Sequence, residues 1–451
     1  MTPTKPGSPV RKMPLLINRN FALLWSGQAI SILGDIVFDT TLVLWIANRI
    51  ALNESWAPLA VSGVVFATSL PAFVLGPIAG VFVDRWDKRS TMLWTDALRA
   101  LLIFLLMFIS GLIPLPFVPP IQLSRLWQLD MIYTIVVLVT TCSQLFNPSR
   151  FVLIGDLVPE LERPHASGFF HGTANLCLIL GPPLAASLLF SMGVQWALAI
   201  NACSFVASFL TLLAIHVPQS INPETSQPRR QIFHEFGAGM RFLATSNVLR
   251  TLLLVMCLVL LGGGISNTLE FFFVTQNLHA TPTLYGFLST ASGIGLLLGT
   301  MLAGWGAKHI GGIARTFWLG VLVLGVMEIL YARLTDYTLA LIILFLQGIP
   351  NAALNVAYGP LIMSATPRPF LGRVSALLSP LTNLAALLST VAAGYLVSTL
   401  LHNFHASILG IAIGPIDTLF TISGLLAVLG GIIAMLNLRS LKTGSRPFPL
   451  L

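Results

Sequence analysis

The chain has 451 residues, of which 55% are hydrophobic and only 9% are charged. Soluble domains carry about 25% charged residues, so this composition excludes an ordinary soluble protein and favours a chain that is solvated by lipid. The net charge of +8 does not indicate a nucleic-acid partner, because the basic residues fall between apolar runs rather than in one polar segment.

Twelve apolar runs are long enough to cross a membrane as helices. A spanning helix needs about 20 apolar residues, whereas a spanning strand is about half as long and alternates in polarity. The predicted spans are 21–48, 58–83, 90–113, 127–147, 167–191, 194–217, 248–276, 283–306, 314–333, 337–362, 373–400 and 416–438. The N-terminus is polar and basic and has no short apolar stretch followed by a cleavage site, so we expect no cleaved signal peptide.

The distribution of Lys and Arg predicts the orientation of the spans. If both termini are cytoplasmic, 20 of these residues lie on the inner side of the membrane and 3 on the outer side. Basic residues favour the cytoplasmic side, and one missed span would invert every later loop. We therefore expect a multi-pass protein of a plasma membrane, of the bacterial inner-membrane type.

The first span contains two acidic residues, Asp35 and Asp39, which are four positions apart and share a helix face. A rise of about 1.5 Å per residue places Asp35 past the midplane and Asp39 near the outer interface. Ionisable groups inside lipid are costly, so both are candidates for proton coupling or for binding a cationic substrate. The alternative is that each pairs with a neighbouring polar group.

The turn between the second and third spans combines glycines with closely spaced charges: Gly76, Gly80, Asp84, Arg85, Asp87, Lys88 and Arg89. The two glycines leave one helix face bare, so that a neighbouring helix can approach closely. Asp84 can accept hydrogen bonds from the N-terminus of a facing helix, and the basic residues can pair with acids or lipid headgroups. The alternative is a plain basic anchor, which would not need Asp84.

Three further features mark the rest of the first half. Asp96 and Arg99 are three positions apart near the inner end of the third span, and we expect an ion pair that supports the adjacent turn. The segment 181–183 (Gly-Pro-Pro) should kink the fifth span, because proline removes backbone hydrogen bonds. Residues 218–247 read as a polar connector followed by a short amphipathic helix at 232–236 on the inner membrane face. The predicted units are two six-helix bundles, 1–217 and 248–451, joined by this linker.

The second half has its own polar residues within apolar runs. Glu270 lies near the outer end of the seventh span and Glu328 near the middle of the ninth, and Asn351 and Asn355 are four apart on the tenth. These four are candidates for proton coupling or substrate binding; interfacial placement or helix–helix hydrogen bonding is the alternative. The segment 304–312 echoes the glycine-rich turn of the first half, which indicates two related halves with a substrate site between them.

Residues 80–89 resemble the inner-loop signature of the major facilitator superfamily: Gly, three residues, Asp-Arg, two residues and two basic residues. The twelve spans and the long central loop match that superfamily as well. Finer features resemble its drug-exporter branch, which includes macrolide efflux proteins; they lie at 18–21, 34–35, 96–99, 146–150, 156–160 and 372–374. Two departures are Asp87 in place of Gly, and the lack of an Arg in the fourth span.

The resemblance implies the major facilitator fold, an all-α membrane protein of twelve transmembrane helices. It also implies that Asp84 latches onto the start of the eleventh span near Arg373. Gly181 and Pro182 are similar to the Gly-Pro element of antiporters in this superfamily.

These observations together predict a secondary active transporter that exports hydrophobic or amphipathic, drug-like or macrolide-like compounds by proton antiport with alternating access. Alternatives are a siderophore or lysolipid transporter of the same fold, or a non-transporting membrane sensor or assembly partner. We do not expect an enzyme, because no cluster of nucleophile, base and metal ligands is present. The expected partners are a small amphipathic substrate, protons and lipids, with no cofactor, metal or nucleic acid, and we expect a monomer.

Overall fold

The computed structural model describes residues 17–110, 124–216, 240–309, 311–367, 370–402, 404, 406–408 and 411–438. For residues 77–85, 303–308, 376, 406–408 and 411–413 it describes the backbone only. Within these residues, twelve helices are long and apolar enough to cross a membrane. The predicted helical class and number of spans are therefore confirmed. The side of the membrane on which the termini lie stays a prediction.

The first half contains six long helices, which are α1 (Arg19–Trp45), α2 (Ala57–Arg85), α3 (Lys88–Ile109), α4 (Arg125–Leu157), α5 (Arg163–Ser191) and α6 (Val194–Leu213). The second half contains α8 (Asn247–Phe272), α9 (Tyr285–His309), α10 (Ile313–Tyr331), α11 (Tyr337–Ala365), α12 (Leu371–Tyr395) and α13 (Pro415–Leu438). Single π-helical turns extend α1, α8 and α12, at Ile46–Ile50, Phe273–Asn277 and Leu396–Leu400. Short 3₁₀ turns precede α5 and α9, at Glu160–Glu162 and Pro282–Leu284.

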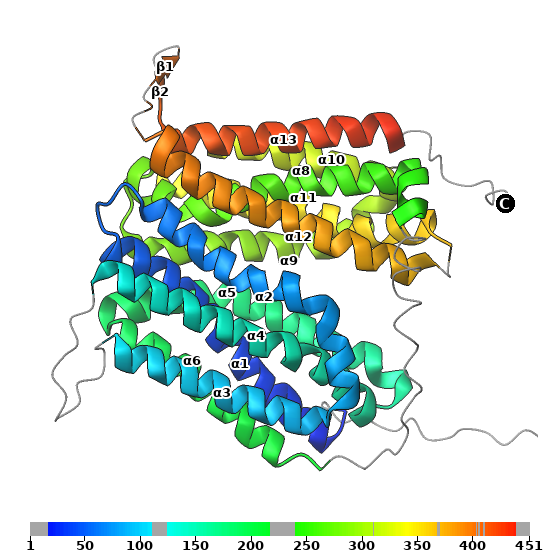
Figure 1. Ribbon diagram of the computed structural model, residues 1–451. Coiled ribbons are helices and arrows are strands. Elements are labelled where there is room, and N and C mark those ends of the chain that lie inside the picture. Colours follow the sequence, from blue (N-terminus) through cyan, green and yellow to red (C-terminus); the bar gives the residue numbers. More distant parts are fainter. Residues whose placement is uncertain are drawn as a thin grey trace, which may run out of the picture.

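A short antiparallel hairpin is an addition to the predicted all-α fold. Strands β1 (Ala406–Ile408) and β2 (Ile411–Ile413) pair between α12 and α13, outside the membrane-spanning helices. We call the end of the molecule that carries this hairpin the hairpin end. The opposite end, where α1 begins and α13 finishes, is the terminal end; in Figure 1 it lies on the right.

The helices begin where the sequence supplies polar caps. The Asn18 side chain accepts a hydrogen bond from the backbone N–H of Phe21 at 2.7 Å, and Asp336 accepts one from Leu339 at 2.8 Å. Such caps satisfy N–H groups that have no partner within the first helical turn. They explain why α1 and α11 start at these positions rather than elsewhere in the apolar runs.

Helix α4 is ten residues longer than predicted at its C-terminal end, because it continues to Leu157 rather than stopping near residue 147. Pro148 normally favours a helix end. Here, however, Phe146, Ser149 and Leu153 are buried on the same helix, and their packing outweighs the lost backbone hydrogen bond. Arg150 therefore lies within a helix, and not in a loop as the sequence suggested.

The two halves lie one above the other in Figure 1, with the second half uppermost. They meet mainly through α5 against α9 and α2 against α12. The largest hydrophobic cluster joins both halves and contains Leu42 and Trp45 of α1 together with Leu269 and Phe272 of α8. These residues lie in the hairpin-end parts of their helices, so the hairpin end is closed by a shared core.

The terminal end has no such shared core in the described part of the chain. One cluster there contains residues between Leu243 and Leu438 only, and the other contains residues between Phe21 and Ile215 only. Each half thus packs on itself at this end. The conformation is closed at the hairpin end and parted at the terminal end, which is the inward-facing state if the termini are cytoplasmic.

The expected close approach of a neighbouring helix at Gly76 does not occur in this conformation. A Cβ atom added at Gly76 would find no heavy atom within 4 Å. The reason is the separation of the halves, since Gly76 lies in the terminal-end part of α2. The side chains of Asp84 and Arg85, and the surroundings of Gly80, lie outside the described residues, so the latch stays a prediction.

Candidate transport cavity

A cavity of ≈ 600 Å³ lies between the two halves. The first half contributes residues of α1 and α5, and the second half contributes residues of α8, α9, α10, α11 and α13. Much of the lining is apolar, including Leu178, Met256, Leu260, Leu296 and Leu324. Pockets of about 300–1,000 Å³ suit drug-sized molecules, so this cavity has the volume of a small-molecule site.

The cavity gathers most of the predicted coupling and binding residues, although they come from distant parts of the chain. Those that line it are Asp39, Glu270, Glu328, Asn351 and Asn355, together with Pro182 of the Gly-Pro element. Asp39 is contributed by the first half and both glutamates by the second. Asn351 and Asn355 share a hydrogen bond of 3.0 Å along α11. Asp35 is not part of the lining.

Glu328 is held in place by neutral donors. It is 7% exposed, and its Oε1 accepts a hydrogen bond from the Ser266 hydroxyl at 2.8 Å. The amide nitrogen of Gln347 donates to the other carboxylate oxygen. Sequence reasoning missed both donors. One signal was available: Gln347, Asn351 and Asn355 form a polar stripe on α11 at helical spacing.

An aromatic group lies beside the two glutamates. Tyr331 and Phe420 both line the cavity. The centre of the Tyr331 ring lies 4.8 Å from that of the Phe273 ring and 5.7 Å from that of the Phe420 ring. The side chain of Tyr331 lies within electrostatic range of Glu270 and Glu328. Tyr331 is only 1% exposed, and its hydroxyl has no hydrogen-bond partner in the part of the chain that the structure describes.

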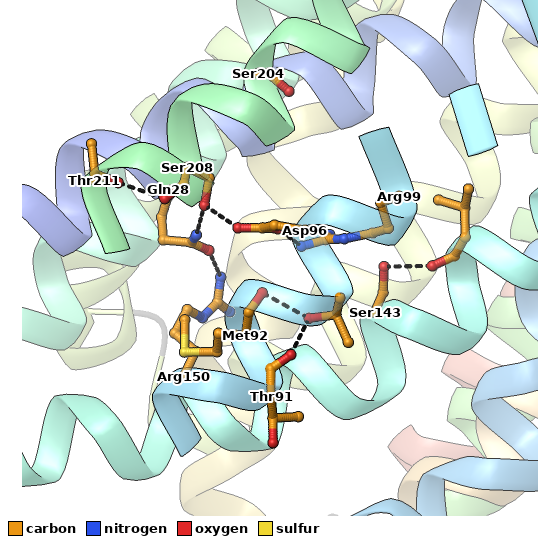
Figure 2. Close-up of polar contacts among 12 residues, drawn as sticks. Gln28, Thr91, Met92, Asp96, Arg99, Ser143, Arg150, Ser204, Ser208 and Thr211 are labelled. Atoms are coloured by element: carbon orange, nitrogen blue, oxygen red, sulfur yellow. Dashed lines mark hydrogen bonds and ion pairs between the residues drawn. The ribbon is translucent and has the colours of Figure 1, made fainter. Parts of the chain in front are cut away.

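A second group of polar side chains lies inside the first half, on the terminal-end parts of α1, α3, α4 and α6. Figure 2 shows the contacts among them. Asp96 and Arg99 form the predicted ion pair, and both are almost fully buried. The Ser208 hydroxyl donates to Asp96 at 2.6 Å, and Gln28 donates to Ser208 at 2.9 Å. Arg150 in turn donates to Gln28 at 3.2 Å. We call these five residues the α1–α6 polar network; its proposed support of the neighbouring turn remains a prediction.

Aromatic rings complete the surroundings of Arg99. Its guanidinium carbon lies 4.4 Å from the centre of the Phe146 ring and 4.3 Å from that of Phe205. A guanidinium over an aromatic face is stabilised electrostatically, which offsets part of the cost of burying the charge. These contacts come from α4 and α6, so the sequence spacing of Asp96 and Arg99 alone could not reveal them.

Along α1, Asp35 lies between Asp39, which lines the cavity, and Gln28 of the α1–α6 polar network. It is within electrostatic range of Arg99, Asp96 and Arg150, and its charge is also felt by Asp39 one helical turn away. The neighbouring Gly34 packs against Asn201 and Ser204 of α6, which brings the two helices close. The two acids of the first span therefore have different surroundings: Asp39 faces the cavity, and Asp35 is next to the buried network.

The charged turn after α2 forms contacts within its own half. The Asp87 side chain caps α3 by accepting a hydrogen bond from the N–H of Ser90 at 2.7 Å, which explains an acid at this position. Arg89 donates to the carbonyls of Leu212 and Leu213 at the end of α6, at 3.0 and 2.8 Å. Arg89 thus binds backbone oxygens here rather than the acid or headgroup that we expected.

The remaining members of this motif are placed as follows. Lys88 is the first residue of α3, and it is not without a partner. Arg373 lies near the start of α12, with its guanidinium carbon 5.5 Å from the centre of the Phe370 ring. Both remain candidates for the gate at the terminal end, where the halves are separate in this conformation.

The Gly-Pro element contacts both halves. A Cβ atom at Gly181 would lie 2.5 Å from the side chain of Ile36, so α1 and α5 approach closely at this glycine. Pro183 has no N–H, and the carbonyl of Ile179 therefore loses its usual intrahelical partner. The Thr290 hydroxyl of α9 donates to this carbonyl at 2.6 Å. A hydrogen-bonding group of α5, whose predicted kink stays a prediction, is thus satisfied from the opposite half.

Two six-helix halves around a central acidic cavity define the class of membrane transporters with the major facilitator fold. A profile of the family described as transmembrane secretion effectors matches residues 12–379, and the chain belongs to this family of the major facilitator superfamily. It is also 25% identical to the uncharacterized MFS-type transporter YfiS of Bacillus subtilis (strain 168), over 94% of each chain. The multidrug efflux pump Tap of Mycolicibacterium fortuitum is 24% identical, over 81% of this chain and 86% of that protein.

A solved structure supports the same fold. The crystal structure of a bacterial homologue of the iron transporter ferroportin, in an inward-facing state, superposes with a TM-score of 0.71 at 15% identity. The superposition covers 94% of this chain and 99% of that chain. The resemblance to the superfamily and to its drug-exporter branch is confirmed, and the protein is a multi-pass membrane transporter rather than an enzyme.

Proposed function

We propose that the protein exports hydrophobic or amphipathic compounds of drug size from the cell by proton antiport in the plasma membrane. One observation carries this proposal: a single cavity between the halves combines apolar walls with three carboxylates, Asp39, Glu270 and Glu328. Apolar walls suit an amphipathic substrate, and carboxylates can bind and release protons. Similarity to the multidrug efflux pump Tap supports export rather than uptake.

Alternating access would follow from the two interfaces that close the hairpin end. α5 packs on α9 and α2 packs on α12, so rocking of the halves has to separate these pairs to open the cavity at the hairpin end. The parted terminal end would close in the same movement, which is where the charged turn and Arg373 lie. The cavity would then be exposed to each side of the membrane in turn.

Protons would use the acids of α1. Asp39 lines the cavity, and Asp35 lies one turn nearer to the α1–α6 polar network. Together they offer consecutive proton sites between the substrate cavity and the terminal end. Binding of substrate would favour release of a proton from the cavity acids, and the returning proton would favour release of substrate.

The proposal is tested with purified protein in vesicles that contain a pH-sensitive dye and are exposed to a panel of amphipathic compounds. We expect compound-dependent proton movement, and we expect Asp39→Asn to reduce it at least about tenfold, because a carboxylate that carries the proton cannot be replaced by an amide. Asp130→Asn is the matched control, since Asp130 lies exposed on α4 and does not line the cavity.

Compound export that continues unchanged after the proton gradient is collapsed would contradict antiport. The same panel should include a siderophore and a lysolipid, because transport of either one alone would keep the fold and change the cargo.

A further inference from the structure

We propose that the hairpin-end part of the cavity is a subsite for a protonated amine, in which Glu270 and Glu328 balance its charge and the Tyr331 hydroxyl accepts an N–H hydrogen bond. This inference rests on the proposed export function and names the chemical class of its substrate. It follows from three observations: the negative charge of the lining, the hydrogen bonds that fix the Glu328 carboxylate, and the Tyr331 hydroxyl, which has no hydrogen-bond partner among the described residues.

The charge of the lining is one-sided. Asp39, Glu270 and Glu328 line the cavity, whereas none of the described residues that line it is Lys, Arg or His. Charges act strongly on one another where apolar walls exclude water. A cation that enters this cavity is attracted by the carboxylates, and an organic anion of the same size is repelled.

Glu328 is oriented as a receptor group rather than left free to turn. Ser266 and Gln347 each donate to one of its carboxylate oxygens, and Ser423 is a further hydrogen-bonding neighbour. Two carboxylate oxygens have about four acceptor sites, so capacity for a ligand N–H remains. Glu270 lies close enough to interact with Glu328 electrostatically. Two neighbouring anions at one end of an apolar cavity repel each other, so a cation placed between them would relieve that repulsion.

Tyr331 supplies the atom that distinguishes a protonated amine from other cations. Tyr331 lines the cavity, and its hydroxyl is buried and has no hydrogen-bond partner among the residues described. A buried polar group that lacks a hydrogen bond costs free energy, so a ligand that satisfies it binds more tightly. A protonated amine offers an N–H to the hydroxyl, whereas a quaternary ammonium group offers none.

The apolar body of such a substrate has room in the rest of the cavity. Leu178 of α5 and Met256, Leu260, Leu296 and Leu324 of the second half line it. The hydrophobic lining thus extends from the acidic subsite toward the middle of the molecule. A compound with one protonated amine and one bulky apolar part fits this division.

The test uses three fluorescent probes with the same naphthyl body, ending in a tertiary amine, in its N-methyl quaternary ammonium analogue or in a neutral amide. Binding to the purified protein is measured at equilibrium without any proton gradient. We expect the amine to bind at least about tenfold more tightly than the amide, because the charge is recognised by buried carboxylates. We also expect it to bind more tightly than the quaternary analogue.

Variants separate the roles of the three residues. Glu328→Gln and Glu270→Gln should each weaken amine binding at least about tenfold while changing amide binding little. Tyr331→Phe should weaken binding of the amine but leave that of the quaternary analogue unchanged, since only the amine donates to the hydroxyl. Asp417→Asn is the matched control: Asp417 is a buried acid of the same half that does not line the cavity.

Equal affinity for the amine and the amide in the wild-type protein would overturn the inference, and so would unchanged amine binding in both glutamate variants. If the amide nevertheless drives proton movement in vesicles, the proposed function stands and only the cation subsite fails. If one glutamate variant does not fold, the other variant and Tyr331→Phe still decide the question.

Discussion

At the scale of single residues, Asp87 illustrates how a departure from a family pattern acquires a physical reason. It stands where Gly is common in the superfamily, and the structure shows it as the N-terminal cap of α3. Hydrogen bonds from Ser90 hold the pKa of Asp87 below its ordinary value, and Arg89 and Lys88 add to this effect. A carboxyl group with a lowered pKa in the folded state stabilises the fold above its unfolded pKa of about 3.9, and this contribution is lost as the pH falls through the lowered value.

We expect Asp87→Ala to lower the free energy of unfolding by about 0.5–2 kcal/mol at neutral pH, which is the usual effect of losing such a cap. Asp87→Asn should keep most of the cap and remove the dependence of this contribution on acid. Thermal unfolding of the purified protein in detergent, from neutral pH down to about pH 3, measures both effects. A loss of stability in acid that is equally steep in the wild type and in Asp87→Asn would contradict this role.

Residues also show where prediction from sequence reaches its limit. Asp39, Glu270 and Glu328 could be singled out because charges inside apolar runs are costly. Tyr331 and Ser266 could not, because such residues are common in apolar helices and only their contacts give them a role. Arg150 lies beyond the predicted span 127–147, but the structure has it within α4, because buried side chains carry this helix past Pro148.

At the scale of helices, the contact between α5 and α9 combines a hydrogen bond with close helix packing at the interface of the two halves. Thr290 donates to the carbonyl that Pro183 leaves free, and Gly286 and Gly293 allow α9 to touch Pro182 and Ile179 directly. We expect Thr290→Val, which keeps the shape and removes the hydroxyl, to weaken the closed hairpin end by about 1–2 kcal/mol. Thr290→Ser should behave like the wild type.

The measurement is the distance between spin labels at Ser191→Cys and Thr281→Cys, in a protein whose native cysteines are replaced by serine. Both positions are exposed at the hairpin end, one in each half. Thr290→Val should increase the population with the longer distance by about 5- to 30-fold. Equal populations in the Val and Ser variants would show that the hydroxyl does not hold the interface.

At the scale of the whole molecule, the length and hydropathy of the apolar runs were sufficient to predict twelve helices in two halves, because each run has to span the same thickness of lipid. They were not sufficient for the conformation. Apolar runs that are buried on one side and face lipid on the other have little periodicity, so the sequence could not tell which face of α1 or α10 borders the cavity. Gly76 shows the consequence, because its predicted helix contact depends on a conformational state that this structure does not adopt.

The closed hairpin end can be fixed covalently to test whether the protein must open there. A Cβ atom at Gly394 of α12 would lie 2.7 Å from the Cβ of Ser62 of α2, and a disulfide needs about 3.8 Å between these atoms, so a small separation suffices. We expect the oxidised Ser62→Cys/Gly394→Cys protein to lose transport at least about tenfold and to regain it on reduction, because alternating access requires both ends to open. Each single variant, treated with the same oxidant, is the control.

If the reduced double variant is itself inactive, Leu59→Cys/Ser398→Cys offers a second pair, since the Leu59 amide and the Ser398 hydroxyl are 3.1 Å apart. Full transport by a completely cross-linked protein would mean that substrate leaves the cavity without separating α2 from α12, and rocking of the two halves would then have to be abandoned.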